Sequence, residues 1–177
     1  MKIKFLIMLF CLSLIWGSGC SISYYTREIT PEEGQKAVEY AISQVGKPYV
    51  LGAQSPDVGF DCSGLVVWGY QQVCPNLLFK NQGKIYNDAT VEALFSENTI
   101  PIPLEQARAG DIVFVRNKDG IVCHCGLFIE PTIEGHFKVV HASGGLGYVV
   151  IEEWALGEEV RGYIVHSIGR LYETFKE

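Results

Sequence analysis

The sequence predicts an α+β domain in which amino-terminal helices pack on a central antiparallel β-sheet of about five strands. Helical patterns with capping residues occur before residue 75, and short runs rich in valine, isoleucine and aromatic residues follow Gly110. Helices and strands do not alternate, so a parallel sheet is not expected. The 177 residues, 48% of them hydrophobic, supply enough apolar surface for one domain with its own core.

Residues 1–19 have the pattern of an export signal. Positively charged residues precede an almost entirely apolar run over 5–16, which is short for a bilayer span, and small residues then lead into Cys20. This junction resembles the lipobox at which bacterial lipoproteins are cut and acylated, although Gly17 stands where that motif usually has leucine. We therefore expect a cleaved signal peptide, a lipid anchor on Cys20 and a tether over residues 20–29.

The residue after Cys20 and the overall charge bear on location and partners. Ser21 is not acidic, so it carries no signal for retention in the inner membrane. We expect a monomer anchored in the outer membrane and facing the periplasm, with an ordinary secreted protein as the alternative. The formal net charge of -6 offers no basic field for phosphates, so no nucleic-acid partner is expected.

The first predicted helix begins after Thr30, an N-cap residue that is followed by proline. Glu33, three residues further on, completes a capping-box pattern. The helix should run to Val45, because Gly46 ends it and a Lys-Pro pair prevents a restart. Residues 49–60 are rich in glycine and proline and should form a loop at the surface or at the rim of a cleft.

The second predicted helix begins at Asp61 or Cys62 and is apolar on most sides, which indicates that it is buried. Residues 75–108 have the weakest pattern; a helix is expected at 88–95 and an extended segment at 100–103. The runs that predict strands are Asp111–Val115, Ile121–Ile129, Phe137–Ala142, Tyr148–Ile151 and Gly162–Ile168.

Cys62 is a candidate nucleophile because it follows a good N-cap residue. Its sulfur should lie in the first turn of the second helix, where the partial positive charge favours thiolate over thiol. Backbone N–H groups of that turn have no partners within the helix and could stabilise an oxyanion. A cysteine in a helix is more often a small core residue, so a catalytic role also requires a base.

Two of the four histidines can be related by strand geometry. If the runs at 121–129 and 137–142 form a hairpin centred on the segment between them, His124 lies directly opposite His141. Side chains so placed are close enough for one imidazole to orient the other, and Gly126 should leave open space beside them. A nucleophile, a base and an orienting group are the minimum for an activated-thiol enzyme. The remaining histidines, expected to be structural or surface residues, are His136 and His166.

The segment Cys123-His124-Cys125 also has the residue types of a zinc site. Successive side chains of a strand point to opposite faces, so both cysteines should face away from His124 and could not converge with it on one ion. We therefore expect no metal and no cofactor. A disulfide from Cys74 to Cys123 or Cys125 and buried free thiols are both possible.

Five segments resemble, in order, the motifs of the NlpC-type murein endopeptidases, a family of papain-like cysteine peptidases. They are Gly46–Tyr49 with Gly52, Phe60–Val66, Gly110–Phe114, His124–Ile129 and Val140–Ser143. The resemblance spans most of the sequence after Cys20, and it implies a papain-like peptidase domain over residues 30–174.

The resemblance implies hydrolysis of an amide bond in peptidoglycan stem peptides, commonly between γ-D-glutamyl and a diamino acid. By motif position, Cys62 would be the nucleophile, His124 the base and His141 the orienting residue. Three further residues match positions beside the nucleophile or in the substrate cleft, namely Tyr49, Asp61 and Ser63.

The sequence departs from the family in two places. The Pro-Arg-containing segment that is common before the first strand is replaced by Asn87–Thr90, and Cys125 stands where valine usually follows the histidine. Three other functions fit less well: transfer of the acyl group to an amine or lipid by the same triad, a non-catalytic wall-binding lipoprotein, and a redox or metal protein built on the cysteines.

Overall fold

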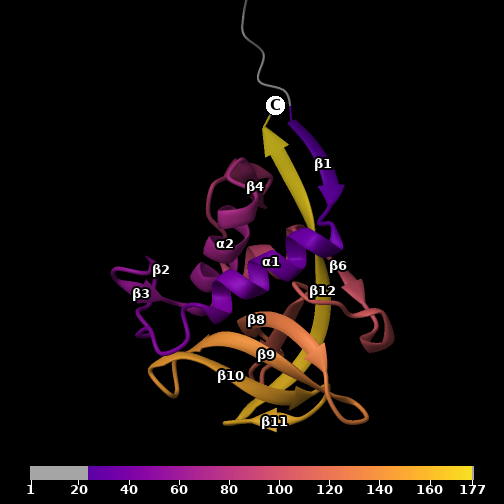
Figure 1. The fold of residues 1–177 in the computed structure, drawn as a ribbon. Helices are drawn as coiled ribbons and strands as arrows, with labels where there is room; N and C mark the ends of the chain where they lie inside the picture. The colour runs from indigo at the N-terminus through magenta and orange to yellow at the C-terminus, as the bar shows by residue number, and fades with distance from the viewer. Residues whose placement is uncertain (1–23, 177) are drawn as a thin grey trace, which may run out of the picture.

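The computed structural model describes residues 24–176 (Figure 1). The expected signal peptide and Cys20 lie outside these residues. Three helices pack on a mainly antiparallel sheet, which confirms the predicted α+β class. In this part of the chain, no helix is both long and apolar enough to cross a membrane.

Helix α1 (Pro31–Ile42) begins at the predicted capping box. The Thr30 hydroxyl accepts a hydrogen bond from the Glu33 N–H at 3.2 Å, and the Glu33 carboxylate accepts one from the Thr30 N–H at 2.9 Å. The helix ends at Ile42, three residues before the predicted Val45, and a turn continues to Gly46, whose φ of 88° suits glycine.

Helix α2 (Cys62–Val73) begins where the sequence predicted. One oxygen of the Asp61 carboxylate accepts a hydrogen bond from the Gly64 N–H at 2.7 Å, so Asp61 is its N-cap. The helix packs on α1 and buries Leu65, Val66 and Tyr70. It is therefore a central core helix, as its apolar composition indicated.

Residues 75–108, the segment with the weakest sequence pattern, contain a hairpin that was not predicted. Strands β4 (Leu77–Asn81) and β5 (Lys84–Tyr86) are joined by a turn in which Gln82 and Gly83 have φ of 51° and 71°. Glutamine is not a usual residue for that conformation, but the Glu97 carboxylate accepts hydrogen bonds from both turn N–H groups.

Short elements complete this region. Helix α3 (Val91–Glu97) is capped by Thr90 and so begins later than predicted, and β6 (Thr99–Ile102) is extended, as expected. A two-stranded hairpin of β2 (Gln54–Ser55) and β3 (Gly59–Phe60) lies within the glycine-rich loop.

The five predicted strands form the centre of the sheet. They are β7 (Ile112–Arg116), β8 (Val122–Pro131), β9 (His136–Ser143), β10 (Tyr148–Ala155) and β12 (Tyr163–Lys176), in the spatial order β10-β9-β8-β7-β12. The long strand β12 also pairs with β4, β6, β11 (Glu159–Val160) and β1. Strand β1 (Tyr24–Glu28) lies in the segment expected to be a tether, and this part of the segment is instead held by pairing with the end of β12.

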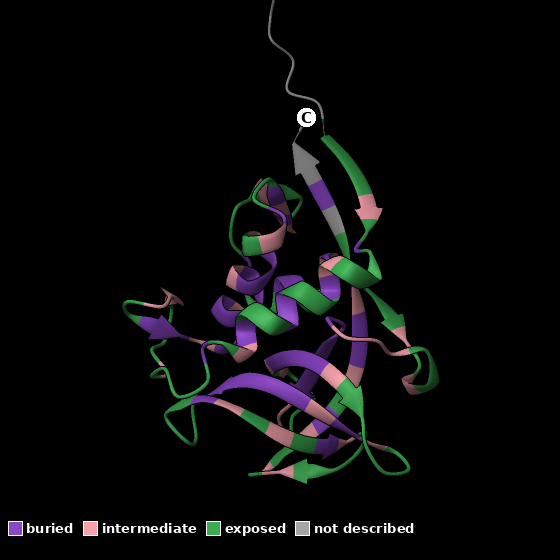
Figure 2. Cartoon of the chain, in the orientation of Figure 1, coloured by how far each residue is buried: buried purple, intermediate pink, exposed green. Residues whose placement is uncertain are grey.

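Buried side chains cover both faces of this sheet. The helices cover one face, where Cys125 and Val140 pack with residues of α1 and α2. The other face carries a second cluster that includes Val139 and Trp154. Figure 2 shows buried residues on the helix surfaces that face β8 and β9 and exposed residues on the outer side of α1.

The predicted register of the β8–β9 hairpin is wrong. Phe128 pairs with Val139 rather than with Phe137, because the loop is displaced and a bulge lies between Phe128 and Glu130. A Cβ placed on Gly126 would come within 2.7 Å of the Cβ of His141. Gly126 therefore does not leave open space; it allows His141 to cross close above the strand.

Candidate active site

Cys62 occupies the first position of α2 and is only 7% exposed. Hydrogen bonds from the Cys125 thiol and then from His124 lower the pKa of Cys62 to about 5, against the raising effect of burial. The sulfur is therefore a thiolate near neutral pH. It lies at a helix amino terminus, where N–H groups without helical partners also favour negative charge.

His124 and His141 lie on neighbouring strands and are hydrogen-bonded. The Nε2 of His124 is 2.9 Å from the Nδ1 of His141, and the rings are edge to face with centroids 5.0 Å apart. In the observed register they are diagonal neighbours rather than directly opposed residues, because His141 lies over Gly126. The expected contact between His124 and His141 is present. The strand register from which it was predicted, with the two residues directly opposite each other, is not observed.

The chain of hydrogen bonds continues beyond His141. The Nε2 of His141 is 2.9 Å from the Oε2 of Glu152 on β10, and Arg161 donates to both oxygens of the Glu152 carboxylate. Hydrogen bonds from Arg161 and then from His141 lower the pKa of Glu152 against desolvation, so the carboxylate is ionised near neutral pH.

The middle of this chain is shielded from water. His141 is 2% exposed, and the ring of the buried Trp154 lies 4.6 Å from it between centroids. Burial and then the neighbouring His124 lower the pKa of His141 to about 3, so its imidazole is neutral near neutral pH.

A bulge in β8 changes the predicted directions of the cysteines that flank His124. Val115 pairs with His124 and Arg116 with Val122, so Cys123 is the extra residue. Cys125 is fully buried on the helix side, as the alternation predicted. The prediction is wrong for Cys123, which is exposed and lines the same cavity as His124.

In residues 24–176 no disulfide joins Cys62, Cys74, Cys123 or Cys125. The structure therefore corresponds to the alternative without a Cys74 disulfide, and the Cys74 thiol donates to the Glu33 carboxylate at 3.5 Å. Residues 24–176 contain no group of three or more histidine, cysteine or acidic side chains arranged to hold a metal ion.

Three residues expected near the nucleophile lie around the start of α2. Burial, and then the negative charges of Cys62 and Asp61, raise the pKa of Tyr49, which places its hydroxyl in the environment of the sulfur. The second Asp61 oxygen accepts a hydrogen bond from the Gly52 N–H at 2.8 Å, and the Ser63 hydroxyl donates to the first at 3.1 Å. Asp61 thus ties the glycine-rich loop to the helix that carries Cys62.

A cavity of about 460 Å³ opens beside these groups. Its walls include Tyr49, His124, His141, Ser143, Trp154 and Arg161. Tyr49 and His124 border the cavity, and each interacts electrostatically with Cys62, so the cavity adjoins the surroundings of the nucleophile.

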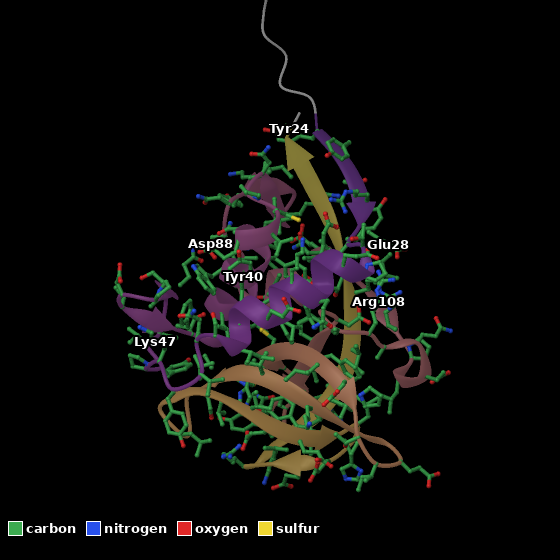
Figure 3. All side chains as sticks on the ribbon, in the orientation of Figure 1. Tyr24, Glu28, Tyr40, Lys47, Asp88 and Arg108 are labelled. Atoms are coloured by element: carbon green, nitrogen blue, oxygen red, sulfur yellow. The ribbon has the colours of Figure 1, made fainter. Side chains whose placement is uncertain are left out.

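The side chains labelled in Figure 3 are not among those that line this cavity. Lys47 lies at the end of the molecule that carries β2 and β3, where its ammonium donates to the Pro56 carbonyl at 3.0 Å. Arg108 lies beside Glu28 and donates to the Ile29 carbonyl at 2.6 Å, which ties β1 to the loop before β7.

Comparison with known proteins identifies the family. The model of the NlpC/P60 family matches residues 46–161. The chain belongs to the NlpC/P60 family.

Two relatives and one solved structure illustrate the match. The murein DD-endopeptidase MepH of Escherichia coli is 32% identical over 100 residues, which are 54% of this chain and 34% of MepH. The probable endopeptidase YafL of the same species is 32% identical over 140 residues, or 78% of this chain and 44% of YafL. The chain thus spans less than half of either relative.

The solved structure of NlpC1 from Trichomonas vaginalis has the same fold. It superposes with a TM-score of 0.60 at 22% identity, over 79% of this chain and 44% of that chain. The papain-like arrangement predicted for this NlpC/P60 chain is therefore confirmed.

Three residues of the site in this NlpC/P60 chain were not predicted from the sequence. Glu152 and Arg161 lie outside every motif used, and only the pairing of β9 with β10 brings Glu152 to His141. Cys125 was named only as a departure from the valine that is usual in the family. Its position one residue after His124, on the face toward α2, was a usable signal for a thiol near Cys62.

The other two histidines lie outside the chain of hydrogen bonds. His136 begins β9 and contacts the Glu134 carbonyl at 3.1 Å. His166 lies on β12 beside Phe95, with ring centroids 5.8 Å apart.

Proposed function

We propose that this NlpC/P60 chain hydrolyses an amide bond in peptidoglycan stem peptides with Cys62 as nucleophile and His124 as base. The observation that carries the proposal is a thiolate-stabilising site at Cys62, in contact with a histidine that a second histidine orients. The murein endopeptidase MepH supports the choice of substrate by its similarity. The bond proposed is that between γ-D-glutamyl and a diamino acid.

The reaction has two stages. The Cys62 thiolate attacks the amide carbonyl, and backbone N–H groups at the start of α2, with the Tyr49 hydroxyl, stabilise the oxyanion. His124 donates a proton to the leaving amine, and the C–N bond breaks to give an acyl-enzyme. Water, deprotonated by His124, then attacks the thioester and releases Cys62.

Asp61 and Ser63 are proposed to line the substrate cleft near the amine of the stem peptide. The Asp61 carboxylate is fixed by its bonds to Gly64 and Gly52, so its negative charge has a constant position. A fixed carboxylate suits a cationic amine. A monomer is proposed as the active form.

The test is digestion of purified disaccharide-peptides by the protein, with fragments identified by mass spectrometry. Cleavage between D-glutamyl and the diamino acid is expected for the unchanged protein and for Cys74→Ala, a matched control because Cys74 is also buried and lies at the other end of α2. Cys62→Ala should abolish cleavage.

Other outcomes would contradict the proposal. Intact peptides that bind equally to the unchanged protein and to Cys62→Ala would indicate a wall-binding protein. Products joined to an added amine rather than to water would indicate acyl transfer.

We also propose that Cys20 carries the lipid and that the protein faces the periplasm from the outer membrane. The small residues before Cys20 and the serine after it support this proposal. Membrane fractionation tests it: Cys20→Ala should lose the acyl mass from the amino-terminal peptide and leave the outer-membrane fraction. An unchanged distribution and an unmodified cysteine would contradict it.

A further inference from the structure

Glu152 makes its polar contacts with two partners at the end of the site's hydrogen-bond chain. Its Oε2 lies 2.9 Å from Nε2 of His141 and 2.8 Å from Nη1 of Arg161, and its Oε1 accepts from Nη2 of Arg161. The Glu152 side chain is 19% exposed and that of Arg161 40%. The carboxylate is therefore held from two sides, by the buried imidazole of His141 and by the partly exposed guanidinium of Arg161.

An ionised carboxylate can only accept hydrogen bonds, and this fixes the protons on the two imidazoles. His141 must carry its proton on Nε2 to donate to Glu152. Since His141 is neutral, its Nδ1 is then an acceptor, and Nε2 of His124 must donate to it. The nitrogen of His124 that remains for Cys62 is Nδ1.

Arg161 keeps the Glu152 carboxylate ionised, which the protonation of His141 on Nε2 requires. Its two hydrogen bonds orient the carboxylate and stabilise its charge. The backbone of Arg161 has φ of 52°, a conformation that residues other than glycine rarely adopt. Arg161 and Gly162, with φ of 52° and 85°, are the two turn residues between β11 and β12, and this hairpin brings the arginine to Glu152.

We propose that Glu152, clamped by Arg161, is a positioning residue that fixes the tautomers of His141 and His124 and so directs Nδ1 of His124 toward Cys62. The effect on catalysis rests on the proposed function, but the effect on the tautomers does not. Neither Glu152 nor Arg161 is among the groups that shift the pKa of Cys62, so their effect on it passes through the two histidines.

The test is nitrogen-15 NMR of the histidine side chains in the full protein. In the unchanged protein, His141 should be protonated on Nε2 alone, and Nε2 of His124 should carry a proton. Glu152→Gln keeps the shape of the side chain but adds an N–H donor, so it should shift part of His141 to the Nδ1–H tautomer. Glu153→Gln is the matched control, since Glu153 is the next residue on β10 and is exposed, and it should leave the spectrum unchanged.

Kinetics give a second readout. Glu152→Gln should lower kcat by roughly 10- to 100-fold with little change in KM, a smaller loss than when the group that directly orients the base is altered. If Glu152 only filled space or held β10 in place, the isosteric glutamine would match glutamate in both measurements. Circular dichroism and thermal unfolding show that the compared variants are folded.

The results separate this proposal from the proposed function. An unchanged His141 tautomer in Glu152→Gln, or Nδ1 protonation in the unchanged protein, would overturn the role of Glu152 even if the wall is cleaved. A tautomer shift in a protein that cleaves no stem peptide would support the positioning role and reject only the peptidase.

Discussion

The thiol of Cys125 donates a hydrogen bond to the sulfur of Cys62, and this contact is the largest of the effects that lower the pKa of Cys62. The same contact and burial hold the pKa of Cys125 well above its ordinary value, so Cys125 stays protonated and acts as the donor. The residue after the histidine thus contributes to the state of the nucleophile.

Replacing Cys125 with valine should therefore raise the pKa of Cys62 above about 5, because the S–H donor is lost while burial remains. The pKa of Cys62 can be measured from the pH dependence of its alkylation by iodoacetamide, followed by mass spectrometry of the α2 peptide. The midpoint should move to higher pH in Cys125→Val and stay in place in Cys74→Val. An unmoved midpoint would show that Cys125 does not tune the sulfur.

Gly126→Ala should destabilise the protein by about 1–3 kcal/mol through overpacking. A Cβ at this position would lie 2.6 Å from Cγ1 of Val139, 2.7 Å from Cβ of His141 and 2.8 Å from the Val140 carbonyl oxygen. Urea unfolding gives the free energy of unfolding. Gly144→Ala is the control, since its new Cβ would make only ordinary contact with the Tyr49 ring at 3.4 Å; equal stability of the two variants would contradict the close approach.

Asp111→Ala should cost about 3–5 kcal/mol of stability, because it removes one partner of a buried ion pair. Asp111 is 3% exposed, and Arg170 donates to both its oxygens at 2.9 Å. Glu130→Ala breaks the exposed pair with Lys138 and should change stability by about 0–1 kcal/mol. Chemical unfolding gives the free energy of unfolding of both variants. Similar losses of stability in the two would contradict the larger effect expected for the buried pair at Asp111.

Glu33 should make stability depend on pH in the acid range. The bidentate hydrogen bonds from Arg27, each 2.7 Å, lower its pKa from 4.5 to about 2. Its contribution is therefore complete above about 4.5 and is lost as the pH falls toward 2. Unfolding in urea at several pH values should show a smaller acid-range loss for Glu33→Gln than for the unchanged protein; parallel curves would exclude this linkage.

Local sequence signals predicted the helix starts and the strands. Thr30 and Asp61 cap helices as expected, and the runs after Gly110 form the centre of the sheet, because both features depend on neighbours in the sequence. The register of the β8–β9 pairing could not be predicted in the same way. It depends on the length of the connecting loop and on a bulge between Phe128 and Glu130, and neither has a local sequence pattern.

In the site too, residues in local motifs were predicted and residues brought in by distant strand pairing were not. Cys62, His124 and His141 lie together, and their roles in catalysis stay predictions. Glu152 and Arg161 reach them only through strand pairing and a turn after β11, so nothing near them in the sequence marked them. The strand β1 was missed for a similar reason: its partner is 144 or more residues away, at the other end of the chain.

The pairing of β1 with β12 also decides how the domain carries a mechanical load. Tyr24 pairs with Lys176 and Glu28 with Tyr172, at the end of the molecule away from β10 (Figure 1). A force on Tyr24 directed away from β10 is parallel to β1 and β12. The hydrogen bonds between the two strands are then loaded together in shear rather than broken one after another. If the proposed lipid on Cys20 holds the protein, a force on the amino-terminal segment would be resisted by the hydrogen bonds of this strand pair acting together.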